Sequence, residues 1–183
     1  MKWPAIFALT CLAAVSASDY SLLGGRLQFA APAGWREVAH RTEGDSISFV
    51  AFVVPRSASD PSAPAGNVMI DASLSHDRWD LKTYSDGKLA QEAAGPGQPA
   101  IVDDRLWKHD HSRTVLSTSR LRGAPYALWD KFAVRDRILL NIRTAIPVAY
   151  ANDSLWQARY EADLDSLVRS FRIGRQQLFP PQR

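Results

Sequence analysis

The sequence predicts an α+β domain in which two main helices flank a central antiparallel sheet. Up to four alternating apolar runs follow one another between residues 100 and 146, and their connections are only two or three residues long. Connections this short can join antiparallel strands but not parallel ones. Two amphipathic helical segments interrupt and end the series of strands, and each must bury its apolar stripe against a sheet. These observations together define the fold class.

Length and composition are those of one globular domain. The chain has 183 residues, of which 46% are hydrophobic and 22% charged, and its formal net charge is +3. Its one cysteine excludes a disulfide scaffold and a Cys-rich zinc module. Because no polybasic run is present, we expect no nucleic-acid partner.

The first residues have the order of a secretory leader. Met1-Lys2 is positive, Trp3 to Val15 is apolar, and small residues precede a cleavage site after Ala17. We therefore expect residues 1–17 to be a cleaved signal peptide, and the protein to be periplasmic or secreted with no membrane insertion of the mature chain. Lipidation at Cys11 and a buried N-terminal element remain alternatives.

Four strands are expected in the first half: Arg26–Ala30, Trp35–Arg41, Ile47–Val54 and Asn67–Leu74. The turn at Pro32–Gly34 predicts that the first two are partners. Ile47–Val54 is apolar at nearly every position, which is typical of a strand covered on both faces. Pro55 to Gly66 is rich in Pro and Ser and is expected to be a loop.

The first helix is expected after Asp77, whose carboxylate is a candidate N-cap. The meander follows, with strands near 100–108, 113–122, 126–135 and 137–146. The last helix begins at Asp153-Ser154, with Ser154 and Gln157 as a candidate capping box. The domain is thus expected to cover residues 18–174, and residues 175–183 are expected to form a flexible tail because they have nothing to pack against.

Several segments in this order resemble the PsbP/Mog-type fold family. They are the opening "LQFAAPAGWREV", the helix "DRWDLKTYSDGKLAQE", the meander end "DRILLNIRTAIP" and the closing helix "WQARYEADLDSLVRSFRI". The resemblance implies a bacterial secreted member of unassigned role. Members mostly act by binding other proteins and share no catalytic centre, so the resemblance assigns no functional residue.

Candidate chemistry is sparse. His109 and His111 share a strand face at i and i+2 and are weak candidates for metal ligands. Lys108 and Arg113 flank them and oppose a cation, and a solvated turn is the alternative. The sequence has no nucleophile elbow, no metalloprotease motif and no phosphate-binding loop. We therefore expect neither enzyme activity nor a cofactor.

The meander carries the candidate contact residues. Trp and Arg are enriched at interface hot spots, and the expected partner-binding residues are Trp107, Arg120, Arg122, Trp129 and Arg143. A solvated sheet face is the alternative. A two-residue turn at Asp136-Arg137 places Asp130 opposite Arg143. The two helices are expected to contribute less, and the loop Pro55–Gly66 is a second candidate.

The sequence therefore predicts a non-catalytic periplasmic protein-binding module. It would be either an accessory subunit of an envelope complex or an immunity protein against a periplasm-targeted toxin. A small-ligand or metal-binding periplasmic protein is the alternative, and a hydrolase comes third.

Overall fold

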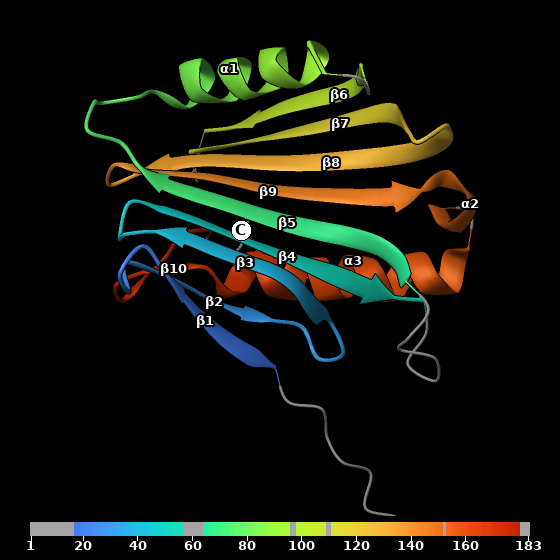
Figure 1. Ribbon diagram of the computed structural model, residues 1–183, viewed down its shortest axis with the longest axis horizontal. Helices are drawn as coiled ribbons and strands as arrows, with labels where there is room; N and C mark the ends of the chain where they lie inside the picture. The colour runs from blue at the N-terminus through green and yellow to red at the C-terminus, as the bar shows by residue number, and fades with distance from the viewer. Residues whose placement is uncertain (1–16, 57–63, 96–97, 109–110, 152, 180–183) are drawn as a thin grey trace, which may run out of the picture.

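The computed structural model describes residues 17–56, 64–95, 98–108, 111–151 and 153–179. Its largest element is an antiparallel sheet of seven strands, drawn across Figure 1. In spatial order the strands are β3 (Arg36–Glu43), β4 (Ile47–Pro55), β5 (Pro64–Leu74), β9 (Ile138–Pro147), β8 (Ala124–Arg135), β7 (Ser112–Leu121) and β6 (Ala100–Trp107). The predicted meander is confirmed, because β6 to β9 pair in chain order.

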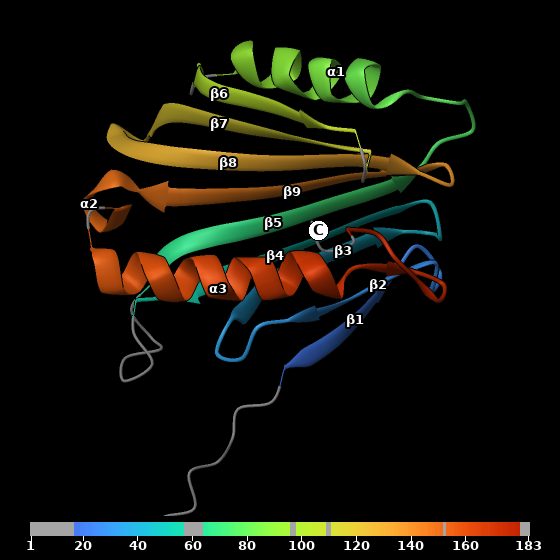
Figure 2. The same ribbon diagram turned by 180° about the vertical axis from the view of Figure 1, so that it is seen from behind.

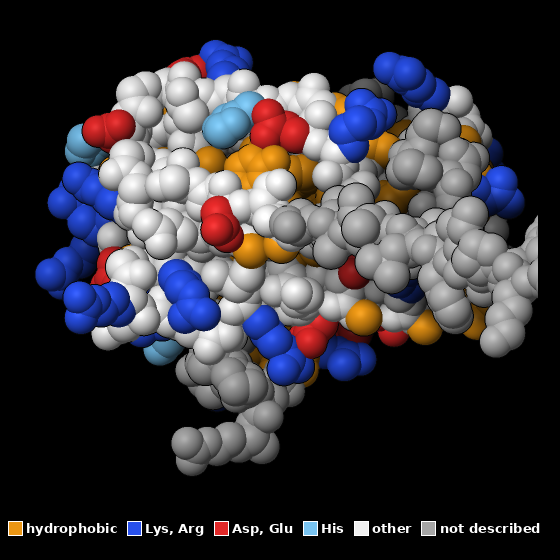
Figure 3. Space-filling model, turned by 90° about the horizontal axis from the view of Figure 1, so that it is seen from below, with side chains coloured by type: hydrophobic (Ala, Val, Ile, Leu, Met, Phe, Trp, Pro, Cys, Tyr) orange, Lys and Arg blue, Asp and Glu red, His pale blue; other side chains and the backbone are white. Residues whose placement is uncertain are grey.

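A second, small sheet was not predicted. It contains β1 (Ser18–Leu22), β2 (Leu27–Ala31), β10 (Arg172–Ile173) and β11 (Gln176–Gln177). The predicted pairing of the strand at 26–30 with that at 35–41 is wrong, since β2 pairs with β1 and β10 while β3 pairs with β4. The turn before Trp35 carries the chain from one sheet to the other. Seen from below, Lys and Arg side chains lie at both ends of the molecule, with hydrophobic side chains visible between them (Figure 3).

Two long helices pack on opposite faces of the large sheet. α1 (Leu81–Ala93) places Tyr84 edge-on against Phe132 of β8, with ring centroids 6.0 Å apart. α3 (Ser154–Ser170) lies on the other face, in front of the strands in Figure 2, where Leu167 joins a core with Ile142 of β9. A short α2 (Val148–Ala151) connects β9 to α3. The predicted sandwich is therefore refined: α3 shares its face with the small sheet.

Aromatic rings join the two sheets in the main core. Phe29 of β2 stacks on Tyr20 at 5.0 Å and on Phe171 at 4.8 Å, and Phe52 of β4 meets Tyr20 edge-on at 5.1 Å. Phe52 and Phe171 are completely buried. Offset and edge-on ring pairs of this kind add stability beyond the area they bury. This core holds α3 and the small sheet in place.

β4 is not covered equally on its two faces. Val50, Phe52 and Val54 are buried against the small sheet, whereas Ile47 on the other face is 42% exposed and Phe49 is half-buried. The prediction of a strand buried on both faces is thus wrong for part of β4. α1 packs on β7 and β8, so it leaves this end of its face open.

Both helices begin at a different cap from the expected one. The backbone N–H of Thr83 donates to the carboxylate of Asp80 at 2.8 Å, so Asp80 rather than Asp77 caps α1. The N–H of Trp156 donates to Asp153 at 3.1 Å, so Asp153 replaces the predicted Ser154. Each cap satisfies an amide that has no partner inside its helix.

Two segments expected to be irregular are partly ordered. Leu178 and Phe179 are 1% and 3% exposed, so the prediction of an unpacked tail is wrong up to residue 179. The N–H of Leu178 donates to the carbonyl of Phe171 at 2.8 Å, which folds the end of the chain back onto the core. The predicted loop Pro55–Gly66 is shorter, because its ends belong to β4 and β5 and pair with each other; residues 57–63 lie outside the described residues.

No helix within the described ranges is both long enough and apolar enough to span a bilayer. The expected leader, residues 1–17, lies outside the described residues except for Ala17.

Candidate functional site

A groove runs between the outer strands β6 to β8 and helix α3. Seven strands spaced about 4.8 Å apart make a sheet roughly 29 Å wide, whereas a helix with its side chains is only about 10–12 Å across. α3 and the small sheet therefore cannot cover the whole face, and the outer strands remain open. The resulting groove has a volume of about 570 Å³, which lies in the range of ligand-binding clefts.

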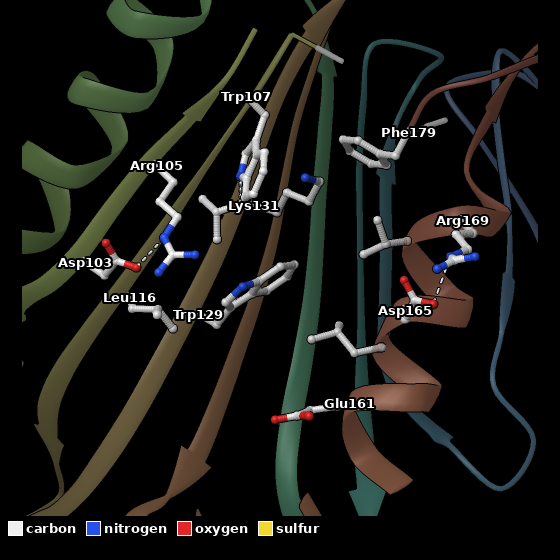
Figure 4. A pocket seen from close by; sticks show the side chains of 13 residues that line it. Asp103, Arg105, Trp107, Leu116, Trp129, Lys131, Glu161, Asp165, Arg169 and Phe179 are labelled. Atoms are coloured by element: carbon white, nitrogen blue, oxygen red, sulfur yellow. Dashed lines mark hydrogen bonds and ion pairs between the residues drawn. The ribbon is translucent and has the colours of Figure 1, made fainter. Parts of the chain in front are cut away.

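Aromatic and aliphatic side chains form the floor of the groove. Strand register places Leu116 directly opposite Trp129, and Trp107 lies on the same face of β6. Figure 4 shows the two indole rings facing the same space. The indole N–H of Trp107 donates to the hydroxyl of Thr114 at 3.2 Å, which fixes this ring against β7. Leu116 remains 38% exposed, so the floor is an apolar surface open to solvent.

A nearly buried lysine closes one end. Lys131 of β8 is 8% exposed, and its ammonium donates to the hydroxyl of Ser112 at 2.9 Å. The same ammonium lies 4.7 Å above the ring of Phe179, a cation–π distance. The last described residue thus packs against the sheet across the groove, and its ring lines that end (Figure 4).

Two ion pairs mark the rims. Arg105 donates to Asp103 at 2.7 Å on the β6 side, and Arg169 donates to Asp165 at 2.8 Å on the α3 side. Figure 4 shows the two pairs on opposite sides of the groove. All four side chains are at least one-third exposed, so these pairs are solvated and contribute little to stability. An apolar floor with a charged rim is the usual arrangement of a protein interface.

The groove continues along α3 into a smaller cavity of about 270 Å³. The two spaces share Leu116, Trp129, Glu161 and Leu164. The wall of the smaller space is formed by Trp156 and Tyr160, whose rings stack at 4.9 Å. Burial raises the pKa of the Tyr160 hydroxyl above its ordinary value, so this phenol stays protonated.

The structure brings together only part of the predicted contact set. Trp107 and Trp129 both line the groove. Arg120 lies on the same sheet face but at the far end of the β7–β8 hairpin, where it borders a different hollow. Arg122 is exposed in the hairpin turn at a φ of 51°. Arg143 points to the opposite face of the sheet, so the five residues do not form one surface.

Arg143 belongs to a buried ion cluster beneath α1. The predicted register is confirmed, since Asp130 and Arg143 are cross-strand partners, and Arg143 donates to both Asp130 oxygens at 2.8 and 2.9 Å. Glu92 of α1 also pairs with Arg143. The Asp130 side chain is completely buried and Arg143 is 19% exposed, so the expectation of a solvent-facing contact residue is wrong for Arg143. Burial raises the pKa of Asp130, and the guanidinium beside it opposes that shift.

Only one of the two candidate metal-binding histidines lies within the described residues. His111 is exposed in the turn after β6, at a φ of 50°. His109 and Asp110 lie outside the described residues. Within the described ranges, no three His, Cys, Asp or Glu side chains come together as metal ligands would.

Sequence reasoning missed most of the groove. Leu116, Leu164, Val168 and Phe179 line it but were not expected to. The sequence did contain one usable indication. Counting back from the tight turn between β7 and β8 places Leu116 directly opposite Trp129 in the hairpin. The approach of α3 and of the chain end left no local signal, because both are long-range contacts.

Two solved structures share this architecture. The chain aligns with the Ran-binding protein Mog1p of Saccharomyces cerevisiae at a TM-score of 0.59 and 15% identity, over 91% of this chain and all of that one. It also aligns with cyanobacterial PsbP (CyanoP) of Synechocystis at a TM-score of 0.53 and 15% identity, over 89% of this chain and 95% of that one. This chain has the PsbP/Mog-type fold. No protein-family profile and no curated protein matches the sequence. At this identity, the PsbP/Mog likeness establishes the fold alone.

Proposed function

We propose that this chain is an exported, non-catalytic protein-binding module, and that its partner binds in the groove between β6–β8 and α3. The observation that carries the proposal is the pair of indoles, Trp107 and Trp129, on one open sheet face with the exposed Leu116 between their strands. Both indoles are half-buried, and Trp side chains in a cleft are enriched at the energetic centre of interfaces. Among the solved structures with this fold, Mog1p is itself a Ran-binding protein.

The groove suits a partner segment with an apolar side chain flanked by charges. The floor supplies the apolar contact, and the rim pairs Asp103–Arg105 and Asp165–Arg169 supply both signs of charge. Because Trp107 and Lys131 are already held by hydrogen bonds to β7, little side-chain freedom is lost when a partner binds. The groove is thus preorganised for association.

Export is the second part of the proposal. The N-terminal charge, apolar run and small-residue exit support removal of residues 1–17, and β1 begins at Ser18, directly after the expected cut. In the periplasm, the protein would serve either as an accessory subunit of an envelope complex or as an immunity protein that blocks a toxin.

A photo-cross-linking residue at Leu116 tests the groove. Leu155, on the first turn of α3, is 85% exposed and does not line the groove, so the same residue at Leu155 is the matched control. We expect a defined protein adduct from position 116 in the native cell and none from position 155. Leu116→Glu should reduce affinity for that protein at least about tenfold, because it places a charge on the apolar floor. Equal adducts from both positions would contradict the proposal.

A small apolar ligand is the second candidate, favoured by the cavity of about 270 Å³ beneath Trp129. Mass spectrometry of the native protein separates the two. A bound small molecule that Leu116→Glu releases, together with no protein adduct from position 116, would favour the ligand.

A further inference from the structure

The groove leads into a cavity that can hold one side chain of a partner. The smaller space along α3 has a volume of about 270 Å³, whereas a cavity of about 150 Å³ is already large enough for a benzene molecule. Its walls are mainly apolar: Ala127, Ile146 and Leu164 line it together with the stacked rings of Trp156 and Tyr160. A whole aromatic or branched aliphatic side chain therefore fits into it.

Glu161 of α3 lies where the groove and the cavity meet. Its side chain lines both spaces, and Figure 4 shows it directed from α3 toward the groove. The side-chain amide of Gln157, one turn earlier on the helix, donates to Oε1 of Glu161 at 2.9 Å. Among the described residues no other donor uses this carboxylate. The hydrogen bond from Gln157 thus restrains the side chain and leaves its second oxygen available to a partner.

Glu161 differs from the other two carboxylates of the groove, because both of those already have a basic neighbour. Asp103 pairs with Arg105, and Asp165 pairs with Arg169. Within the described ranges, no lysine, arginine or histidine forms an ion pair with Glu161, whose hydrogen bond comes from an uncharged amide. The described part of the chain therefore leaves one negative charge at the mouth of the cavity that it does not neutralise.

The charge at this position selects a basic group. An arginine or lysine of the partner gains an ion pair with Glu161, whereas an aspartate or glutamate at the same place faces like charge. Lys131, at the other end of the groove, is only 8% exposed and does not line the cavity. The basic group beside Glu161 therefore has to come from the partner.

We propose that the partner binds through a segment in which a large apolar residue lies close to an arginine or lysine. The apolar side chain fills the cavity beside Trp129, and the basic side chain pairs with Glu161 at its mouth. The inference rests on the proposed function, since it specifies which kind of protein segment the groove takes. Because Glu161 is exposed, the ion pair contributes less to affinity than to the choice between segments.

Peptide selection tests the inference. A phage-displayed library of random peptides, selected on the purified protein, should enrich sequences with an arginine or lysine near a large apolar residue. The affinity of these peptides for Glu161→Lys should fall about fivefold or more, because repulsion replaces attraction, and for Glu161→Gln it should fall less. Asp19→Lys is the matched control, since it makes the same change of charge at an exposed position of β1 outside the groove. That variant should keep the affinity within about twofold of the natural protein.

A second selection tests the specificity directly. Selected on Glu161→Lys, the same library should enrich an aspartate or glutamate in place of the basic residue. Peptides that lose binding to Leu116→Glu but show neither a basic preference nor sensitivity to Glu161→Lys would overturn the inference and leave the groove as a binding site. Peptides that bind Leu116→Glu as well as the natural protein, or a library that enriches nothing, would overturn the groove as a protein-binding site and this inference with it.

Discussion

Replacing Arg143 by methionine should destabilise the fold strongly, although Arg143 resembled a contact residue in the sequence. The substitution leaves Asp130 without its bidentate partner in a completely buried position. Removing one member of a buried ion pair typically costs about 3–5 kcal/mol. Glu92 retains 18% exposure and regains some solvent when its partner is gone, so the lower end applies. We expect a loss of about 3 kcal/mol, or about 6–12 °C in melting temperature.

Urea denaturation followed by tryptophan fluorescence and by circular dichroism measures this loss. Arg105→Met is the matched control, because it breaks an ion pair whose arginine is 63% exposed, and it should cost no more than about 1 kcal/mol. Replacing all three charges by apolar residues (Glu92→Leu, Asp130→Val, Arg143→Met) should restore stability to within about 1–2 kcal/mol of the natural protein, because no buried charge remains. If Arg143→Met alone stays within 1 kcal/mol of the natural protein, the assignment of Arg143 to the fold is refuted.

The pH dependence of the Arg143→Met variant carries a definite sign. Burial raises the pKa of Asp130 in the folded protein, and loss of the guanidinium raises it further. In the folded variant the Asp130 carboxyl group therefore binds its proton more tightly than in the unfolded state, where its pKa is about 4. The loss of unfolding free energy in Arg143→Met, relative to the natural protein, should therefore be complete at pH values above the raised pKa of Asp130. It should shrink as the pH falls through that pKa. A deficit that grows on acidification between neutral pH and pH 5 would contradict this reasoning.

Three further predictions concern other parts of the molecule. Asp80→Ala should lower the unfolding midpoint while Asp77→Ala leaves it unchanged, as measured by urea denaturation, because only Asp80 caps α1. Phe179→Ala should cost about 3 kcal/mol in the same assay, since the ring is 3% exposed; no effect would mean that the chain end does not pack. Hydrogen bonds from Arg113 lower the pKa of Asp104, so its stabilisation is present above about pH 4 and is lost as the pH falls through the lowered pKa. The stability gap between the natural protein and Asp104→Asn should accordingly narrow in acid titrations and persist at neutral pH.

Local pattern was sufficient for the strands of the large sheet and for the two long helices, but not for β1, α2, β10 and β11. Alternation marked β6 to β9, and their short turns made the meander antiparallel, which set Asp130 opposite Arg143. Both properties depend on neighbours within a few residues, so they can be derived from the chain itself. The two indoles of the groove, Trp107 and Trp129, were selected because they lie on the predicted meander and Trp is enriched at interface hot spots; the structure places both on one face of strands that pair through β7.

Contacts between distant segments required the folded structure. β2 pairs with β10 across more than a hundred residues, and Leu178 and Phe179 pack only because that pairing returns the chain end to the core. Sequence alternation cannot say which face of a strand a helix will cover. Because α1 covers one face and α3 only part of the other, Arg143 is buried as a structural ion while Trp129 lines a groove that solvent can enter.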